Sequence, residues 1–149
     1  MTGTCHATAL IVGTAGILIR GPSGSGKSLL ARDLLVHART TARFAALVGD
    51  DRIRLQPLHG RLIAHGLPQT AGAIEMRGRG VETLQYRNAA VIRLVIDFVP
   101  LSTLERMPEE TEFTTEIMGI SVARQPLAAA RRAPLDLIFN ALGEIDSDG

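Results

Sequence analysis

Apolar and polar positions divide the chain into short strands and two helices. Residues 4–12 and 15–20 are apolar and rich in β-branched side chains, with a Gly-Thr dipeptide between them, a pattern typical of a β-hairpin. Residues 44–48 form a continuous apolar run, and residues 90–98 are apolar apart from Arg93 and Asp97; both segments are strand candidates. A hairpin beside such strands predicts an α/β fold with a mixed, partly antiparallel sheet.

Two segments carry apolar residues at helical spacing. A helix is predicted over 27–38, with one apolar stripe made by Leu30, Ala31, Leu34, Leu35 and Ala38. A last helix is expected to begin at Pro134 and to bury Leu135, Ile138, Phe139 and Leu142. Gly143 is predicted to close it, which leaves residues 143–149 as a frayed tail.

The other expected elements are short. Residues 67–81 are rich in glycine and proline and are predicted to form a loop. The remaining expectations are strands at 53–56 and 61–64 around a turn at 57–60, a helical turn at 100–106, and strands at 113–117 and 120–123.

Composition narrows the class of protein. The 149 residues suit a single domain over 1–149, and 46% are hydrophobic while only 3% are aromatic, so we expect an aliphatic core. A net charge of +1 without a long basic run argues against a nucleic-acid binder. One cysteine, Cys5, excludes an intrachain disulfide, and no apolar run approaches membrane-spanning length. We therefore expect a cytoplasmic protein with no membrane partner.

The most informative motif lies between the second apolar run and the first helix. It fits the phosphate-loop pattern G-x-x-x-x-G-K-[ST] and consists of Gly21, Pro22, Ser23, Gly24, Ser25, Gly26, Lys27 and Ser28. Glycines let successive backbone N–H groups converge on an anion, and the helix N-terminus adds positive potential. Lys27 suits the β- and γ-phosphates of ATP, and the Ser28 hydroxyl suits Mg²⁺. The alternative, a Gly/Ser-rich turn before a core helix, fits the full match less well.

Two adjacent acids, Asp50 and Asp51, follow the predicted strand at 44–48. One carboxylate can hold Mg²⁺ while the other accepts a proton from an attacking hydroxyl. A solvated Asp-Asp turn is the ordinary interpretation of such a pair, but the nearby phosphate loop favours function.

The segment Glu75–Gly80, Glu-Met-Arg-Gly-Arg-Gly, offers further chemistry. Glu75 is a candidate metal ligand, and either arginine of the segment can neutralise a transferring phosphoryl group. An exposed turn of alternating charge explains the segment equally well. Taken singly, His6 is interpreted as a structural histidine and Arg106 as a solvated charge on a helical turn.

Taken in order, these features resemble the catalytic domain of bacterial HPr kinase/phosphorylases. The matching features are His6 ahead of the loop, the loop itself, the acidic pair in 48–51, the signature Glu-x-Arg-Gly-x-Gly at 75–80, and Arg106 after the strand at 91–98. The match covers roughly residues 5–125. The chain resembles a short proteobacterial form of the family that lacks the N-terminal domain.

This resemblance implies an ATP-dependent serine kinase that acts on HPr, the phosphocarrier of the sugar phosphotransferase system, and that also runs the reverse, phosphorolytic reaction. It implies that Lys27 contacts nucleotide phosphates and that Ser28 and Glu75 hold Mg²⁺. Asp51 would be proton acceptor in phosphorylation and donor in reversal, with His6 and Arg106 in the active site. The family's domain is a hexamer and is similar to the nucleotide domain of phosphoenolpyruvate carboxykinase, so a homo-oligomer is expected.

Two other functions remain open. The same fold can phosphorylate a small hydroxyl compound, which a closed pocket would favour. A non-catalytic module that senses ATP would transfer no phosphate, and it would not need Lys27, Ser28, Asp51 and Glu75 together.

Overall fold

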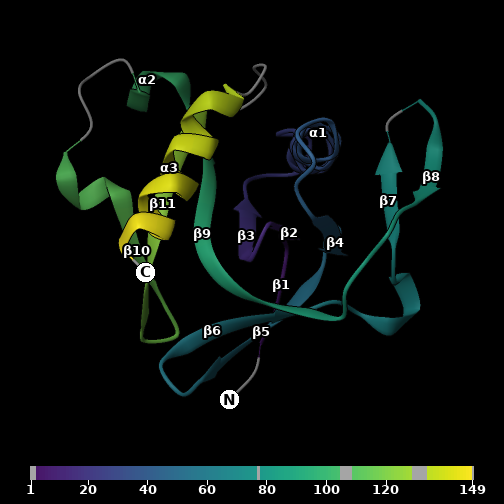
Figure 1. The fold of residues 1–149 in the computed structure, drawn as a ribbon, viewed down its shortest axis with the longest axis horizontal. Helices are drawn as coiled ribbons and strands as arrows, with labels where there is room; N and C mark the ends of the chain where they lie inside the picture. Colours follow the sequence, from purple (N-terminus) through teal and green to yellow (C-terminus); the bar gives the residue numbers. More distant parts are fainter. Residues whose placement is uncertain (1–2, 77, 105–108, 129–133, 149) are drawn as a thin grey trace.

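The computed structural model describes residues 3–76, 78–104, 109–128 and 134–148. Figure 1 shows the longer helices beside a strongly curved sheet, with a separate hairpin at one side. In chain order the elements are β1 (Gly3–Cys5), β2 (Thr8–Val12), β3 (Ala15–Arg20), α1 (Lys27–Thr40), β4 (Ala45–Gly49), β5 (Ile53–Leu58), β6 (Arg61–His65), the 3₁₀ turn η1 (Pro68–Thr70), β7 (Ala73–Met76), β8 (Gly80–Thr83), β9 (Ala89–Val99), α2 (Leu101–Leu104), the 3₁₀ turn η2 (Glu110–Phe113), β10 (Thr114–Ile117), β11 (Ile120–Ala128) and α3 (Leu135–Asp148).

The large sheet is mixed, as the sequence predicts. Its strand order is β1-β5-β6-β9-β3-β2-β4, and β11 joins β9 while β10 joins β11. β3, β9 and β11 run parallel, whereas the remaining pairs of this sheet are antiparallel. β9 serves both parts of the sheet, because its first residues pair with β6 and its later residues lie between β3 and β11.

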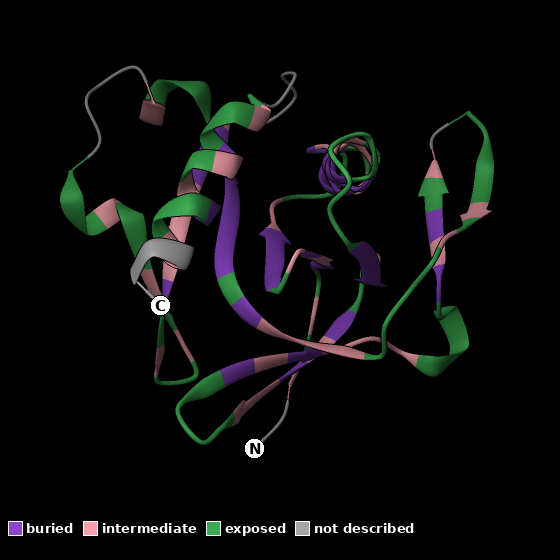
Figure 2. Ribbon diagram, viewed as in Figure 1, coloured by how far each residue is buried: buried purple, intermediate pink, exposed green. Residues whose placement is uncertain are grey.

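The two faces of the central strands bury different clusters. Ile17 and Leu94 belong to the cluster that contains the apolar sides of α1 and α3. Leu18 and Val95 point to the other face, where they join a cluster with Ile53 and other residues of β5 and β6. Figure 2 shows the resulting buried band along β3, β4 and the curved β9. This alternation follows from the two-residue period of a strand.

None of the helices in the described part of the chain has the length and apolar character needed to cross a lipid bilayer.

The expected hairpin is confirmed by the antiparallel pairing of β2 with β3, but its first strand is shorter than predicted. The chain breaks at His6 and Ala7, so that β1 pairs with β5 while β2 pairs with β3 and β4. The prediction of one strand over 4–12 was wrong because apolar alternation does not show where a strand changes partner.

The predicted loop at 67–81 contains a second hairpin, β7 and β8. Its glycines do not break the strands: Gly78 and Gly80 have φ values of 82° and 92°, suited to the connecting turn. Ile74 is fully buried in the cluster beneath α1, which fixes the hairpin to the core.

Two elements extend beyond their predicted ends. β11 continues to Ala128 through Pro126, which an edge strand tolerates because its N–H need not bond. The prediction that Gly143 ends the last helix was also wrong: α3 runs to Asp148, and Ile145 packs against the core. The predicted helical turn at 100–106 corresponds to α2, and residues 105–108 lie outside the described residues.

Candidate active site

The glycine-rich segment 21–28 connects the end of β3 to the beginning of α1. Gly24 and Gly26 have φ values of 78° and 105°, a left-handed conformation that side chains with a Cβ disfavour. The N–H of Ser25 donates to the carbonyl of Pro22 at 3.1 Å, which closes a tight turn. The first N–H groups of α1 have no helical partner and add positive potential at this point.

Lys27 lies across this loop. Its Nζ donates to the carbonyl oxygens of Gly21 at 2.9 Å and Pro22 at 3.1 Å, and the residue is only 7% exposed. The loop therefore holds the ammonium group in one position before any ligand arrives. Lys27 is the one lysine of the sequence.

Close packing makes glycine necessary at position 21. A Cβ there would lie 2.7 Å from Ser25 Oγ and 2.9 Å from the Cβ of Phe98. Within the described residues, Ser25 Oγ is itself a buried oxygen without a hydrogen-bond partner. A buried hydroxyl left in this way is a group that an anionic ligand can satisfy.

The Asp50 carboxylate accepts hydrogen bonds from three separate parts of the site. Its Oδ1 accepts hydrogen bonds from Ser28 Oγ at 2.6 Å and from Thr8 Oγ1 at 3.0 Å. Its Oδ2 accepts from the backbone N–H of Glu75 at 3.1 Å. This carboxylate thus connects β2, the start of α1 and β7.

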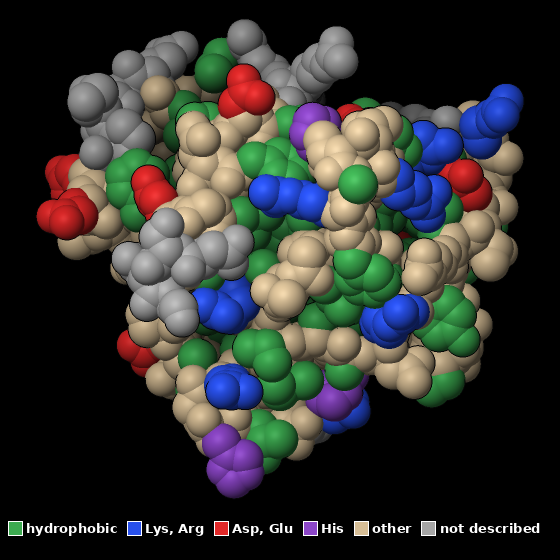
Figure 3. Space-filling model, in the orientation of Figure 1, with side chains coloured by type: hydrophobic (Ala, Val, Ile, Leu, Met, Phe, Trp, Pro, Cys, Tyr) green, Lys and Arg blue, Asp and Glu red, His purple; other side chains and the backbone are tan. Residues whose placement is uncertain are grey.

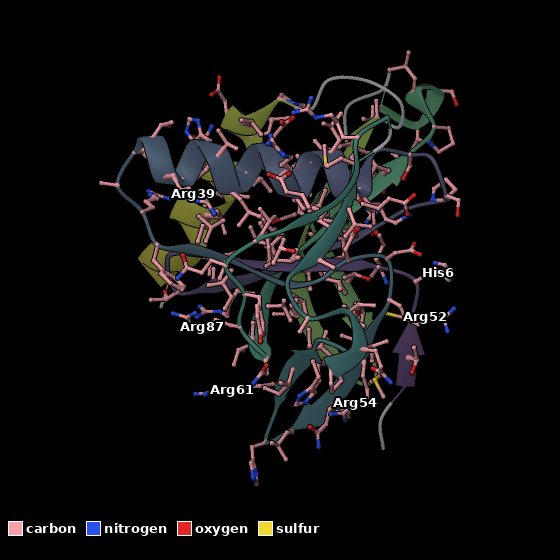
Figure 4. All side chains as sticks on the ribbon, turned by 90° about the vertical axis from the view of Figure 1, so that its right-hand side faces the viewer. His6, Arg39, Arg52, Arg54, Arg61 and Arg87 are labelled. Carbon is pink, nitrogen blue, oxygen red and sulfur yellow. The ribbon has the colours of Figure 1, made fainter. Side chains whose placement is uncertain are left out.

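Asp51 points to a different neighbour. Its φ is 66°, and its N–H donates to Thr8 Oγ1 at 3.3 Å. Its Oδ1 lies 3.2 Å from His6 Nδ1, and the two side chains are 63% and 61% exposed respectively. Figure 4 shows His6 at the edge of the molecule, where a macromolecule can reach it. The break between β1 and β2 is what brings His6 to Asp51.

A cavity of about 1070 Å³ opens over these groups, at the upper end of the range of ligand pockets. Its lining includes Glu75 of β7 and Gly78 and Gly80 of the β7–β8 hairpin. It also includes most of the glycine-rich loop and both aspartates: Ser23, Gly24, Ser25, Gly26, Lys27, Ser28, Asp50 and Asp51. The structure therefore brings Lys27, Ser28, Asp50, Asp51 and Glu75 to one cavity, with His6 beside Asp51.

Arg77 and Arg106, which the sequence predicts to lie in the site, are outside the described residues. Arg79 of the same signature is described and exposed on the turn between β7 and β8.

Sequence reasoning did not single out Thr8, which contacts both aspartates and is fully buried. A lone threonine in an apolar strand gives no signal of such a role, because the hydroxyl's partners lie more than forty positions away.

It also missed a partly buried charge cluster that joins β3, β9 and β11. Asp97 accepts two hydrogen bonds from Arg20, at 2.7 and 2.8 Å, and one from Arg124 at 2.6 Å. Burial disfavours the ionised carboxyl, but these bonds outweigh it and hold the pKa of Asp97 below its ordinary value. Arg20 directly precedes Gly21, so the cluster anchors the strand end that carries the loop. The signal was available, since Asp97 is the one acid of a strand whose other residues, Arg93 apart, are apolar.

The donor set fits magnesium. The described residues include no group of three or more His, Cys, Asp or Glu side chains that could hold a metal. Magnesium is usually bound by one or two carboxylates together with substrate phosphates and water, and Ser28 Oγ and the Asp50 carboxylate lie together beside the cavity. Glu75 is the next carboxylate along its lining.

Fold and site define an α/β protein with a mixed sheet and an anion-suited loop facing acidic side chains across a cavity. Comparison with known proteins is more specific. The HPr kinase/phosphorylase of Mycoplasma mycoides subsp. mycoides is 34% identical over an alignment of 153 positions, gaps included. The alignment covers 93% of this chain and 46% of the relative. That of Clostridium beijerinckii is 33% identical over 129 residues, covering 80% and 40%. The chain belongs to the HPr kinase/phosphorylase family.

A solved structure supports the fold. The Hpr(Ser) kinase/phosphatase from Coxiella burnetii matches 95% of this chain and 88% of its own with a TM-score of 0.76, at 24% identity. No protein-family model matches the chain. Because the chain spans about half the length of the curated relatives it matches, their activity does not pass to it without a test.

Proposed function

We propose that the protein is an ATP-dependent serine kinase whose substrate is an HPr-type phosphocarrier. The observation that carries the proposal is the contact of Ser28 with Asp50 beside the cavity that Lys27 also lines. That arrangement is the one a phosphate-binding loop and its metal-holding acid require. The relatives named HPr kinase/phosphorylase supply the substrate.

In this proposal the loop amides and Lys27 bind the phosphates of ATP, while Ser28 and Asp50, assisted by Glu75, hold Mg²⁺. The metal supplies charge neutralisation to the phosphates. Lys27 Nζ needs little reorganisation for its part, since the carbonyls of Gly21 and Pro22 already orient it. Preorganised charge of this kind accounts for most catalysis of phosphoryl transfer.

As the substrate serine oxygen attacks the γ-phosphorus of ATP, the bond from that phosphorus to the β–γ bridging oxygen breaks and ADP leaves, while the Asp51 carboxylate accepts the proton of the serine hydroxyl. The hydrogen bond that Ser28 Oγ donates to Asp50 supports this division of labour, because it assigns Asp50 and not Asp51 to the Ser28 hydroxyl. His6 Nδ1, 3.2 Å from Asp51 Oδ1, orients that carboxylate. The reverse reaction belongs to the same proposal: inorganic phosphate attacks the phosphorus of phosphoserine, the serine O–P bond breaks, pyrophosphate is released, and Asp51 returns the proton to the serine oxygen.

Exposure favours a protein substrate over a small hydroxyl compound. The Asp51 side chain is 63% exposed, so a serine on a folded partner can reach it. A kinase of a small compound would be expected to enclose its base and exclude water. The third alternative, a non-catalytic ATP sensor, is addressed by the assay below.

Other parts of the proposal rest on the composition of the sequence or on the family resemblance. These are a single catalytic domain over 1–149, a phosphate loop set in a fold similar to the phosphoenolpyruvate carboxykinase nucleotide domain, a hexamer, a cytoplasmic location without a nucleic-acid or membrane partner, and a role for Arg106 in the site. They remain predictions.

The test is to incubate the protein with labelled ATP, Mg²⁺ and purified HPr-type carriers, and to measure phosphoserine. Lys27→Ala is expected to abolish transfer, while Lys27→Arg keeps the charge and serves as its matched variant. Asp51→Asn should bind Mg-ATP with near-normal affinity and lose transfer. Turnover by Lys27→Ala near that of the wild type would refute the proposal, and a collapse of ATP affinity in Asp51→Asn would make Asp51 a metal ligand.

A further inference from the structure

Charge is unevenly distributed along the chain. Residues 52–74 contain three arginines, two histidines and no acidic residue. The remaining 13 basic and 15 acidic residues leave the rest of the protein with an excess of two negative charges. The positive segment begins directly after Asp51 and forms the β5–β6 hairpin, the 3₁₀ turn η1 and the start of β7.

The hairpin presents these cations on one side. Alternate residues of β5 and β6 are buried, among them Ile53, Leu55, Leu62 and Ala64. Residues directly opposite each other in an antiparallel pair share a face, so the register assigns the outward side chains. We call this the hairpin face; its three opposed pairs are Arg54 with His65, Gln56 with Ile63, and Leu58 with Arg61.

The charges on the hairpin face are not neutralised by any described acidic residue. Throughout the described ranges, neither Arg54 nor Arg61 forms an ion pair, and the same holds for Arg52 just before β5. Leu58 is 45% exposed between them. In Figure 3 the lower part of the molecule, where the hairpin projects, shows basic, histidine and hydrophobic side chains, while the acidic ones lie elsewhere on that side.

The hairpin face starts beside the proposed base. Arg52 follows Asp51 in sequence, and Figure 4 shows Arg52 and His6 on the same side of the view, with Arg54 and Arg61 farther along the hairpin. At about 3.3 Å per strand residue, the face reaches roughly 20 Å from Asp51. That is the scale of a protein–protein contact of about 800 Å² per partner.

We propose that the hairpin face docks an acidic surface of the protein whose serine is phosphorylated, an inference that rests on the proposed function. The exposed Arg61 and the half-buried Arg54, interleaved with Leu58 and Ile63, suit a protein partner, since interfaces combine arginine with apolar contacts. A nucleic acid would favour a continuous basic stripe without the apolar residues. Charges of this kind act mainly on association rate and salt dependence.

The test measures phosphotransfer to the carrier at saturating ATP, over a range of carrier and salt concentrations. Arg54→Glu/Arg61→Glu is expected to lower kcat/KM for the carrier by about tenfold at low salt and to flatten its salt dependence. Its kcat and its KM for ATP should stay within about twofold of the wild type, because neither residue touches the cavity over the loop. Arg54→Lys/Arg61→Lys should retain the wild-type values, and Arg39→Glu, an exposed charge at the far end of α1, is the matched control.

An unchanged kcat/KM for the carrier in the charge-reversed variant would overturn the docking proposal and leave the proposed function standing. No phosphoserine with the wild type would overturn both. Two other results would also count against the proposal. If charge reversal changed the sedimentation mass of the protein, the hairpin face would bind a second copy of the chain. If a 20-nucleotide DNA competed with the carrier at a lower concentration than the carrier's KM, the face would bind nucleic acid.

Discussion

Replacing Thr8 with valine tests whether one buried hydroxyl holds both aspartates. Thr8 Oγ1 donates to Asp50 Oδ1 and accepts the N–H of Asp51. The substitution keeps the branched shape that β2 buries and removes only the hydroxyl. Asp50 then retains its bonds from Ser28 and from the Glu75 backbone, while the Asp51 N–H loses its acceptor.

The expected cost follows from these bonds. A hydrogen bond to a charged group contributes about 1.5–3 kcal/mol, and the better burial of a valine methyl recovers about 0.8 kcal/mol. With the unpaired N–H included, we expect a loss of about 2 kcal/mol of unfolding free energy, which lowers Tm by roughly 4–8 °C in a protein of this size. The protein stays folded at 25 °C if its stability is in the usual range of about 5–15 kcal/mol.

Activity should fall further than stability alone explains. If freeing Asp51 raises the barrier to transfer by about 1.4 kcal/mol, kcat falls about tenfold. ATP affinity should change less than about threefold, since Lys27 and its loop contacts are untouched. Steady-state assays with varied ATP and carrier, together with thermal unfolding, separate these effects.

Thr8→Ser is the control, because it loses a methyl and keeps the hydroxyl. If Thr8 acts by positioning, Thr8→Ser should restore kcat to within about twofold of the wild type. If instead valine leaves kcat unchanged and serine lowers it, Thr8 acts by packing and the reasoning is refuted.

Two further predictions concern the base of the loop. Asp97→Asn should reduce the unfolding free energy by about 2 kcal/mol, since two arginines lose a buried charge partner. Because folding lowers the pKa of Asp97, the stability difference from the wild type should be full above about pH 4 and should vanish as the pH falls through the folded-state pKa. Acid unfolding curves of the two proteins would show this. Gly21→Ala should cost about 1–3 kcal/mol and weaken ATP binding by calorimetry, because a Cβ would crowd Ser25 and Phe98. Gly3→Ala, where a Cβ meets nothing within 4 Å, should be neutral; equal losses in the two would contradict the packing argument.

The strands of the central sheet could be predicted because they are long and apolar. Residues 44–48 and 90–98 lie close to β4 and β9 as observed. The β7–β8 hairpin could not be predicted, because its strands are short and largely exposed and Ile74 is their one buried residue. Its existence depends on contact with α1, a tertiary effect that local pattern does not contain.

The residues of the site could be predicted from the sequence, but the contacts between them could not. The loop pattern and the adjacent acids Asp50 and Asp51 indicate their chemistry from sequence. Their division, with Asp50 bonded to Ser28 and Asp51 beside His6, depends on the break between β1 and β2 and on the left-handed backbone at position 51. Only the folded chain shows either feature.

Lys27 gives the protein a built-in chemical reporter. Because every other basic side chain apart from histidine is arginine, an amine-selective acylating reagent has one side-chain target, and that amine is buried under two carbonyl oxygens. Its acylation rate then measures how often the loop opens, and the degree to which a nucleotide slows the reaction measures occupancy directly. The mass shift of the peptide that contains Lys27, read separately from acylation of the N-terminal amine, would titrate the site without any label on the ligand.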